Sequence, residues 1–176
     1  MKEYLVLSLI GSDRTGLVDQ ISEAIMEAGA NLEDSRMAVL GGEFAMIMLC
    51  SMDQGQADQL ESRVRRAAER LELVFTSKKT TARRSYRGTV PLAVQVRGMD
   101  HEGIVHDLVH HMMERGVAVE TLDSHVTNAP YSGTLLFSMN MRVEAPAAVS
   151  LAGLRKSLEE IAERLNVDVE VDTVPV

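Results

Sequence analysis

The sequence contains a single cysteine and no tryptophan. Cys50 has no second cysteine to pair with, which excludes an internal disulfide and fits a reducing compartment. Because Cys50 lies in an apolar segment, we expect it to be an inert, buried side chain. Aromatic residues make up 3% of the chain, and 11 methionines supply flexible apolar side chains in their place.

Positive charge is also in short supply. The 18 Lys and Arg residues are outnumbered by 26 Asp and Glu residues, and the formal net charge is -8. A surface that binds duplex DNA needs clustered cations to displace the counterions of the phosphates. The composition therefore argues against direct nucleic-acid binding, and the sequence has no helix-turn-helix or zinc-finger pattern.

Long apolar runs are missing. The apolar run near the first residue is far too short to span a bilayer, and no signal-peptide cleavage pattern follows it. We therefore expect a cytoplasmic protein without membrane contact. The hydrophobic fraction of 45% is enough for a buried core, and a length of 176 residues permits one large domain or two small ones.

The chain contains an internal repeat. Residues 4–35 align with residues 91–122 without a gap, and later positions match after a small insertion in the second copy. The identical pairs include several glycines and acidic residues: Leu5/Leu92, Gly11/Gly98, Asp13/Asp100, Gly16/Gly103, Val18/Val105, Met26/Met113, Glu27/Glu114, Gly29/Gly116 and Glu33/Glu120. The repeat predicts two domains, residues 1–80 and 91–176, joined by a polar, basic linker at residues 81–90.

Apolar periodicity predicts six elements in the first copy. They are a strand at residues 5–10, a helix at 17–28, strands at 31–40 and 43–51, a helix at 56–71 and a strand at 73–77. Gly41 and Gly42 predict a two-residue hairpin between the middle strands, because both positions tolerate positive φ. Gly29 is expected to end the first helix as a left-handed C-cap.

The second copy repeats the same order. Its elements are predicted at residues 92–97, 104–115, 117–127, 134–144, 147–165 and 167–174. The order β-α-β-β-α-β is typical of the α+β class. It predicts two ferredoxin-like domains in tandem, each an antiparallel sheet with two helices on one face.

A Gly-x-Asp-x-x-Gly turn follows the first strand of both copies. Glycine lets the backbone turn tightly, and the following helix offers unpaired N–H groups to a carboxylate. Asp13 or Asp100 can meet an ammonium group, so the turn suits a free amino acid. The plainer interpretation is that the glycines only permit the turn, while Ser12, Asp13 or Thr15 caps the helix.

The first strand, the GSDRTGLV turn, the helix and the GANLE segment resemble an ACT domain, the regulatory module that senses amino acids. GMDHEGIV opens the second copy in the same way. The resemblance implies that an effector binds between the first-strand turn of one unit and the second strand of a neighbour. It implies ligand contacts at the matching positions, which are Ser12, Asp13, Arg14, Thr15, Gly16, Leu17 and Asn31 in the first copy, and Asp100, His101, Glu102, Gly103 and Ile104 in the second. Ala118 stands where the first copy has Asn31, so the first turn is expected to be the better site.

Histidines and linker cations are the remaining candidates. His101, His106, His110 and His111 gather near one helix. His106 and His110 have the i, i+4 spacing of metal ligands, but no further ligand completes a set, so we expect no metal or cofactor. The basic residues near the linker are expected to stay solvated: Lys78, Lys79, Arg83, Arg84 and Arg87.

The leading hypothesis is a cytoplasmic regulator that is not an enzyme. It would bind glycine or a similar small amino acid and change its contacts with a protein partner, a DNA-binding activator. A free-standing regulatory subunit of an amino-acid metabolic enzyme is the alternative. An acylphosphatase-like enzyme is a third hypothesis, which Arg14 and Asn31 permit, although no nucleophile–base pair, phosphate loop or metal set is visible. The resemblance also implies pairing of units, within the chain or in a homodimer.

Overall fold

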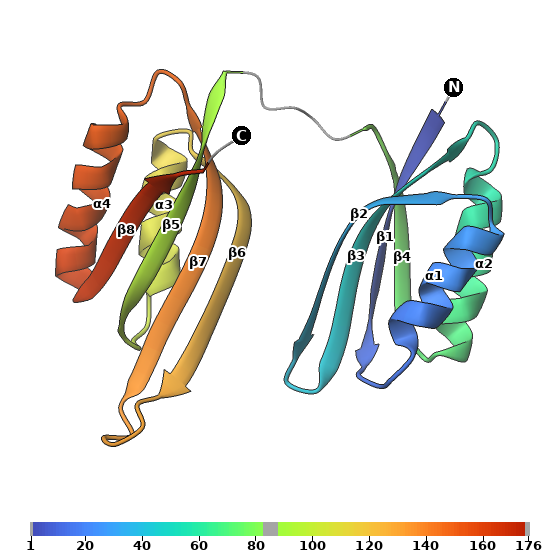
Figure 1. Cartoon of the computed structure of the whole chain (residues 1–176), viewed down its shortest axis with the longest axis horizontal. Coiled ribbons are helices and arrows are strands. Elements are labelled where there is room, and N and C mark those ends of the chain that lie inside the picture. Colours follow the sequence, from blue (N-terminus) through green and yellow to red (C-terminus); the bar gives the residue numbers. More distant parts are fainter. Residues whose placement is uncertain (1, 83–87, 175–176) are drawn as a thin grey trace. The chain divides into compact units, whose positions relative to one another are not determined.

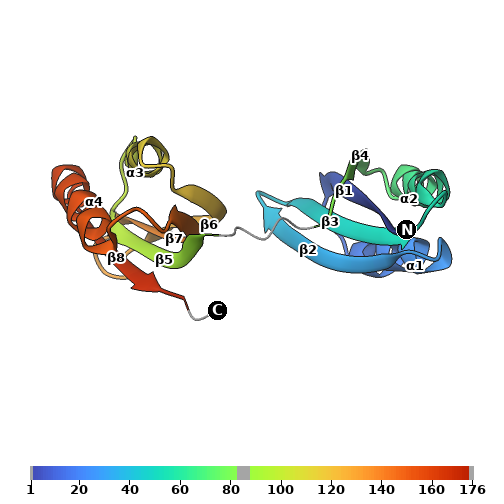
Figure 2. The same ribbon diagram turned by 90° about the horizontal axis from the view of Figure 1, so that it is seen from above.

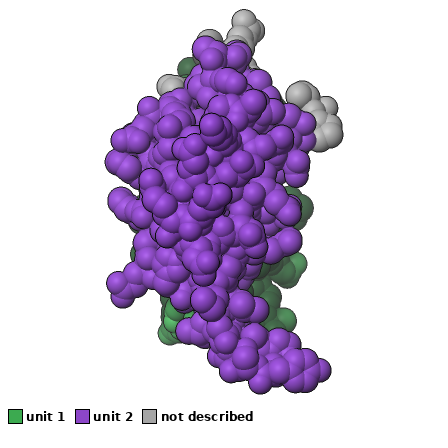
Figure 3. All heavy atoms as spheres, turned by 90° about the vertical axis from the view of Figure 1, so that its left-hand side faces the viewer, with its two compact units in different colours: residues 1–84 green, residues 85–176 purple. Residues whose placement is uncertain are grey.

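The chain folds into two compact units, Met1–Arg84 and Ser85–Val176 (Figure 1). The computed structural model describes residues 2–82 and 88–174. Figure 3 shows the heavy atoms of the two units in separate colours. Arg83, Arg84 and Arg87 of the expected linker lie outside the described residues.

Unit 1 is a four-stranded antiparallel sheet with two helices. Its elements are β1 (Lys2–Ser12), α1 (Leu17–Glu27), β2 (Asn31–Leu40), β3 (Glu43–Asp53), α2 (Ala57–Arg70) and β4 (Val74–Thr80). The strand order is β2-β3-β1-β4, and every neighbouring pair is antiparallel. Both helices lie on the same side of the sheet (Figure 2).

Unit 2 repeats this arrangement. Its elements are β5 (Thr89–Met99), α3 (Ile104–Glu114), β6 (Ala118–Asn128), β7 (Leu135–Pro146), α4 (Leu151–Leu165) and β8 (Val167–Thr173), with strand order β6-β7-β5-β8. The predicted α+β class with two βαββαβ units is thus confirmed. The expected start of the last helix at residue 147 is wrong, because the hydroxyl of Ser150 accepts a hydrogen bond from the Gly153 N–H and begins the helix there.

Alternate residues of the central strands form the two cores. Leu5, Leu7 and Leu9 of β1 are at most 1% exposed and face the helices. Cys50 packs in the same core and is fully buried, as the sequence predicts. Desolvation by burial, followed by the charge of Glu33, raises the pKa of the Cys50 thiol to about 11, which keeps it protonated and unreactive.

The sheet faces that the helices leave open differ between the units. In unit 1 the open face carries exposed apolar side chains from all four strands, which are Ile10, Leu40, Ile47 and Val74. In unit 2 the matching rows are polar and include Gln95, Arg97, Asn140, Arg142, Asp168 and Glu170. The two copies therefore share a fold but differ in the mixture of side chains on the open face, where unit 1 also has Arg36 and Lys78 and unit 2 also has Met99 and Leu136.

The predicted hairpin and helix end are confirmed in unit 1. Gly41 and Gly42 have φ of 60° and 87° and join β2 to β3 in a two-residue turn. Gly29 follows α1 with φ of 73°, and the Ala30 N–H donates to the Ile25 carbonyl. Within residues 2–82 and 88–174, no helix is long and apolar enough to cross a membrane.

Candidate functional site

The first glycine of each turn is required by packing. A Cβ on Gly11 would lie 2.7 Å from Leu73 Cδ2 and 3.1 Å from the Glu72 carbonyl oxygen. A Cβ on Gly98 would lie 2.7 Å from Val167 Cγ1 and 3.0 Å from Val167 Cα. In both units the end of the first strand therefore passes so close to the start of the last strand that an added side chain must displace a neighbour.

The second glycine of each turn is the N-cap of the following helix. Gly16 and Gly103 have φ of 92° and 94°, the left-handed region that other residues rarely adopt. Neither glycine has a side chain to cap the helix. The expectation that Ser12, Asp13 or Thr15 caps α1 is therefore wrong, because the left-handed turn at Gly16 separates them from the helix.

The first turn keeps a helix N-terminus open beside an acidic side chain. Ser12, Asp13, Arg14 and Thr15 are exposed, whereas the Leu17 side chain is buried in the core. The Asp13 N–H donates to the Gly42 carbonyl at 3.0 Å, which ties the turn to the β2–β3 hairpin. The N–H groups of the first turn of α1 form a positive end that suits a carboxylate. The buried Leu17 side chain therefore cannot contact a ligand at the turn.

The Arg14 side chain contacts the C-terminal end of α2. Its Nη2 donates to the Leu71 carbonyl at 2.6 Å, and Leu71 is the C-cap of α2. The carbonyls at a helix C-terminus carry a partial negative charge that favours a cation. Arg14 therefore connects the first turn to the C-terminus of α2 through a hydrogen bond from its guanidinium to a main-chain oxygen.

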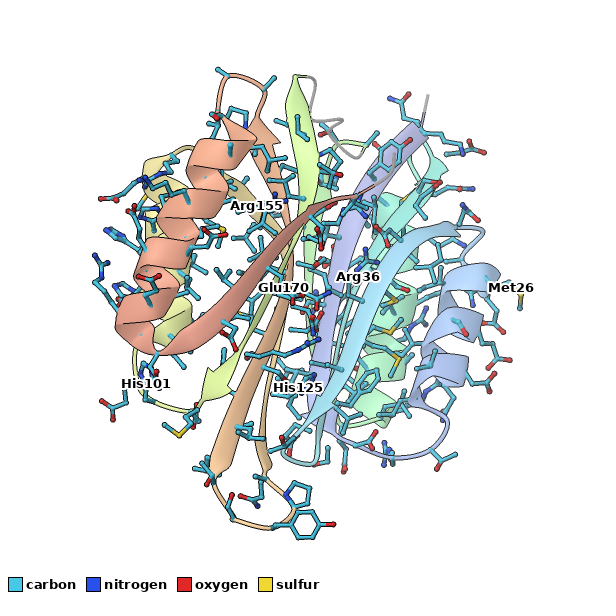
Figure 4. All side chains as sticks on the ribbon, turned by 60° about the vertical axis from the view of Figure 1, so that its left-hand side comes forward. Met26, Arg36, His101, His125, Arg155 and Glu170 are labelled. Carbon is cyan, nitrogen blue, oxygen red and sulfur yellow. The ribbon has the colours of Figure 1, made fainter. Side chains whose placement is uncertain are left out.

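The second turn is built in the same way. The Asp100 N–H donates to the Leu135 carbonyl at 2.9 Å, and the Ile104 side chain is buried while Glu102 is exposed. His101, at the position of Arg14, lies at the end of α4 where the helix leads into β8 (Figure 4). Its Nε2 is 2.6 Å from the Leu165 carbonyl oxygen and its Nδ1 is 2.9 Å from the Glu102 carbonyl oxygen.

Two carbonyl oxygens act on the pKa of His101. The hydrogen bond to Leu165 and then that to Glu102 raise the pKa of the imidazole above 6.5, and the carboxylates of Asp100 and Asp107 add to the effect. Sequence reasoning missed both helix C-termini as parts of the turns. The signal that could have found them is the pair of cations, Arg14 and His101, at one position of the repeat.

Asn31 lies at the far end of the sheet from the first turn. It begins β2 opposite Ser51, which in turn pairs with Tyr4, whereas Ser12 pairs with Glu43 at the other end. The separation of Tyr4 and Ser12 along the strand is about 27 Å at roughly 3.4 Å per residue. Asn31 and the first turn of the same unit therefore cannot touch one small molecule.

The side chain of Asn31 belongs to a small polar cluster. Its Nδ2 donates to Glu33 Oε1 at 3.1 Å, and the buried Ser51 hydroxyl donates to the same oxygen. The Ser51 hydrogen bond, then that of Asn31, lowers the pKa of the Glu33 carboxyl. In unit 2 Ala118 starts β6 opposite Glu144, so this cluster is confined to unit 1 among the described residues.

The remaining candidates lie away from the turns. The rings of His106 and His110 stack with centroids 5.7 Å apart on α3. Residues 2–82 and 88–174 hold no group of three or more His, Cys, Asp or Glu that could bind a metal ion. One surface hollow lies beside β8, over Arg97 and Glu163, and another lies beside Lys2 and Lys79. Neither hollow is lined by a residue of the glycine turns.

The fold and the two turns together define a class of protein. It consists of two ferredoxin-like units in tandem, and in each unit a glycine turn leaves the N-terminus of the following helix without a side-chain cap. The ACT domain family model matches residues 3–78, so unit 1 belongs to this family. The resemblance stated from the sequence is thus confirmed.

Relatives match the whole chain or one unit of it. The chain is 27% identical to a glycine cleavage system transcriptional repressor of Escherichia coli, over 98% of this chain and 91% of that protein. It is 38% identical to a UPF0237 protein of Methanocaldococcus jannaschii, over 38% of this chain and 77% of that protein. The crystal structure of an unknown protein from Galdieria sulphuraria, 30% identical, matches with a TM-score of 0.88 and covers 99% of this chain and 100% of its own.

Proposed function

We propose that this chain is a cytoplasmic, amino-acid-sensing regulator without catalytic activity of its own. It binds glycine or a similar small amino acid at the first turn and alters its contacts with a DNA-binding activator. The observation that carries the proposal is the N-terminus of α1, which has no side-chain cap at Gly16 and opens beside the exposed Asp13. The similarity to a transcriptional repressor over 98% of the chain supports the regulatory role.

The two charged groups of an amino acid fit the two parts of the turn. The carboxylate accepts from the N–H groups of the first turn of α1, where the helix dipole favours negative charge. The ammonium group meets the Asp13 carboxylate. Space for the ligand is left at Gly16, where an added Cβ would find no atom nearer than 3.6 Å.

A homodimer completes the site in this proposal. β2 is an edge strand of unit 1, with main-chain groups free to pair with another strand. A second copy related by a two-fold axis would add its own β2 in the antiparallel sense. Because the strand direction is reversed, the Asn31 of the second copy would lie near the first turn. The Asn31 of the same unit cannot reach this turn, because it lies at the other end of the sheet.

Calorimetric titration of the full chain tests effector binding. Glycine is titrated first, then serine, alanine and the other amino acids. Replacing Asp13→Ala removes a charge-assisted contact of about 1.5–3 kcal/mol, so the affinity is expected to fall roughly 10- to 150-fold. Asp58→Ala is the matched control, since Asp58 is an exposed residue in the first turn of α2. No heat with any amino acid would refute the sensor.

Transcript measurements test the class of partner. If the chain acts through an activator, deleting its gene should change the transcript level of the glycine cleavage genes, and restoring it with Asp13→Ala should remove the glycine response. Unchanged transcripts together with intact amino-acid binding would favour the alternative, a regulatory subunit of a metabolic enzyme.

A further inference from the structure

A cation ties each glycine turn to the C-terminus of the second helix of its unit. In unit 1 the bond runs from Arg14 Nη2 to the Leu71 carbonyl, and in unit 2 from His101 Nε2 to the Leu165 carbonyl, both at 2.6 Å. Arg14 and His101 are aligned in the repeat, and each is followed two residues later by the glycine N-cap. The same tie is therefore made twice, once by a permanent cation and once by a titratable one.

The surroundings of His101 select its charged form by geometry. Both ring nitrogens face carbonyl oxygens, at 2.9 Å for Glu102 and 2.6 Å for Leu165. A carbonyl oxygen only accepts hydrogen bonds, and a neutral imidazole carries only one N–H. Only the imidazolium ion can donate to both oxygens, and the end of α4 attracts its positive charge.

We propose that His101 is a pH-sensitive latch that positions the second turn. Protonated, its ring joins the turn, through Glu102, to the C-terminus of α4, through Leu165. Loss of the proton removes one of the two hydrogen bonds and loosens the turn. The corresponding contact in unit 1 does not depend on pH in this range, because Arg14 stays charged at every physiological pH. The latch is formed by atoms of this chain alone and does not depend on effector binding.

Two carboxylates act on the charge of His101. Asp100 in the turn and Asp107 on α3 favour the cation. Glu163 and Arg164 in the last turn of α4 and Asp168 near the start of β8 are the charged residues that flank Leu165 in sequence. The pKa of His101 is raised in the folded chain. The stabilisation by the latch is therefore complete below pH 6.5 and is lost as the pH rises through the folded pKa.

An NMR titration of the full-length, isotope-labelled chain tests the latch. The ring signals of His101 should titrate with a midpoint above 6.5, and those of His111 below 6.5, because burial lowers the pKa of His111. The His101 ring signals are assigned by their loss in the His101→Arg variant. The amide of Gly103 should shift with the same midpoint as the His101 ring, and that of Gly16 should not.

Two variants that exchange the residues at positions 14 and 101 distinguish the effect of His101 from the titration of other groups. His101→Arg should abolish the midpoint at Gly103, and Arg14→His should create one at Gly16. Because His101 is exposed, the first variant is expected to fold normally. A His101 midpoint at or below 6.5, or a Gly103 response that persists in His101→Arg, would overturn the proposal.

Discussion

The aligned glycines Gly11 and Gly98 should tolerate alanine to different degrees. In Gly98→Ala the new Cβ would meet Val167 at three atoms, with Cγ1 at 2.7 Å and both Cα and Cβ at 3.0 Å. Carbon atoms in contact normally lie about 3.5–4.0 Å apart. A rotation of the Val167 side chain cannot relieve the contact with its Cα, so β5 and β8 must move apart at the register pair of Gly98 and Val167.

The magnitude follows from the cost of overpacking. Inserting a methyl group into a packed site costs about 1–3 kcal/mol, and a clash with main-chain atoms places Gly98→Ala near the top of that range. In Gly11→Ala the shortest contact is with Leu73 Cδ2, the far end of a flexible side chain, while the main-chain atoms Glu72 O and Leu73 Cα lie at 3.1 Å and 3.4 Å. We therefore expect Gly11→Ala to cost about 1–2 kcal/mol and Gly98→Ala about 2–3 kcal/mol.

Amide hydrogen exchange in the full chain is the assay, because it reports the opening free energy of each unit separately. Gly98→Ala should lower protection in β5 and β8 by a factor of about 30 or more while unit 1 is unchanged. Gly153→Ala in α4 is the control. Its Cβ would lie 3.5 Å from the nearest atom, and the higher helix propensity of alanine should stabilise unit 2 by about 0.5–1 kcal/mol. Equal protection in Gly98→Ala and the unmodified chain would refute the close-approach argument.

Three further predictions concern caps and cores. Ser150→Ala should destabilise unit 2 by about 1 kcal/mol in urea denaturation, because it removes the hydroxyl that accepts from Gly153, and Ser150→Asp should retain the cap. Leu7→Ala should destabilise unit 1 by about 3 kcal/mol, since Leu7 is 0% exposed; a loss below 1 kcal/mol would mean that the core closes around the cavity. Between pH 9.0 and about 11 the unfolded Cys50 thiol ionises while the folded one stays protonated, so stability should fall by about 2 kcal/mol more than in Cys50→Ala; parallel pH profiles would contradict this.

The spacing of apolar residues predicted the helices and strands because each of them buries the side chains of one face. The exception is the start of α4, where the apolar residues before Ser150 continue the helical pattern and led to a start at residue 147. Which polar side chain caps a helix depends on the path by which the chain enters it, and this path is set by tertiary contacts. The two hairpin glycines needed no such context, since their φ is fixed by the two-residue turn itself.

The glycine turns of the candidate site could be located from the sequence, but their contacts could not. The glycine spacing located both turns, whereas the contact of Arg14 joins residues 57 apart in sequence and that of His101 joins residues 64 apart. Such contacts depend on where the second helix ends. The remoteness of Asn31 could have been inferred, because a strand–helix–strand connection returns the chain to the end where the first strand began.

The two turns share two glycines and one aspartate. The backbone geometry explains why the glycines are needed, but it does not explain the aspartate. Gly11 and Gly98 are required by close approach to the last strand, and Gly16 and Gly103 by positive φ. The side chain of Asp13 is exposed, and the charge of Asp100 acts on His101. The positions around them differ between the copies, with His101 in place of Arg14 and Ala118 in place of Asn31. In the function that we propose, the acidic side chain shared by both turns meets the ammonium group of a ligand, and in unit 1 the Asn31 of a second copy would lie near it.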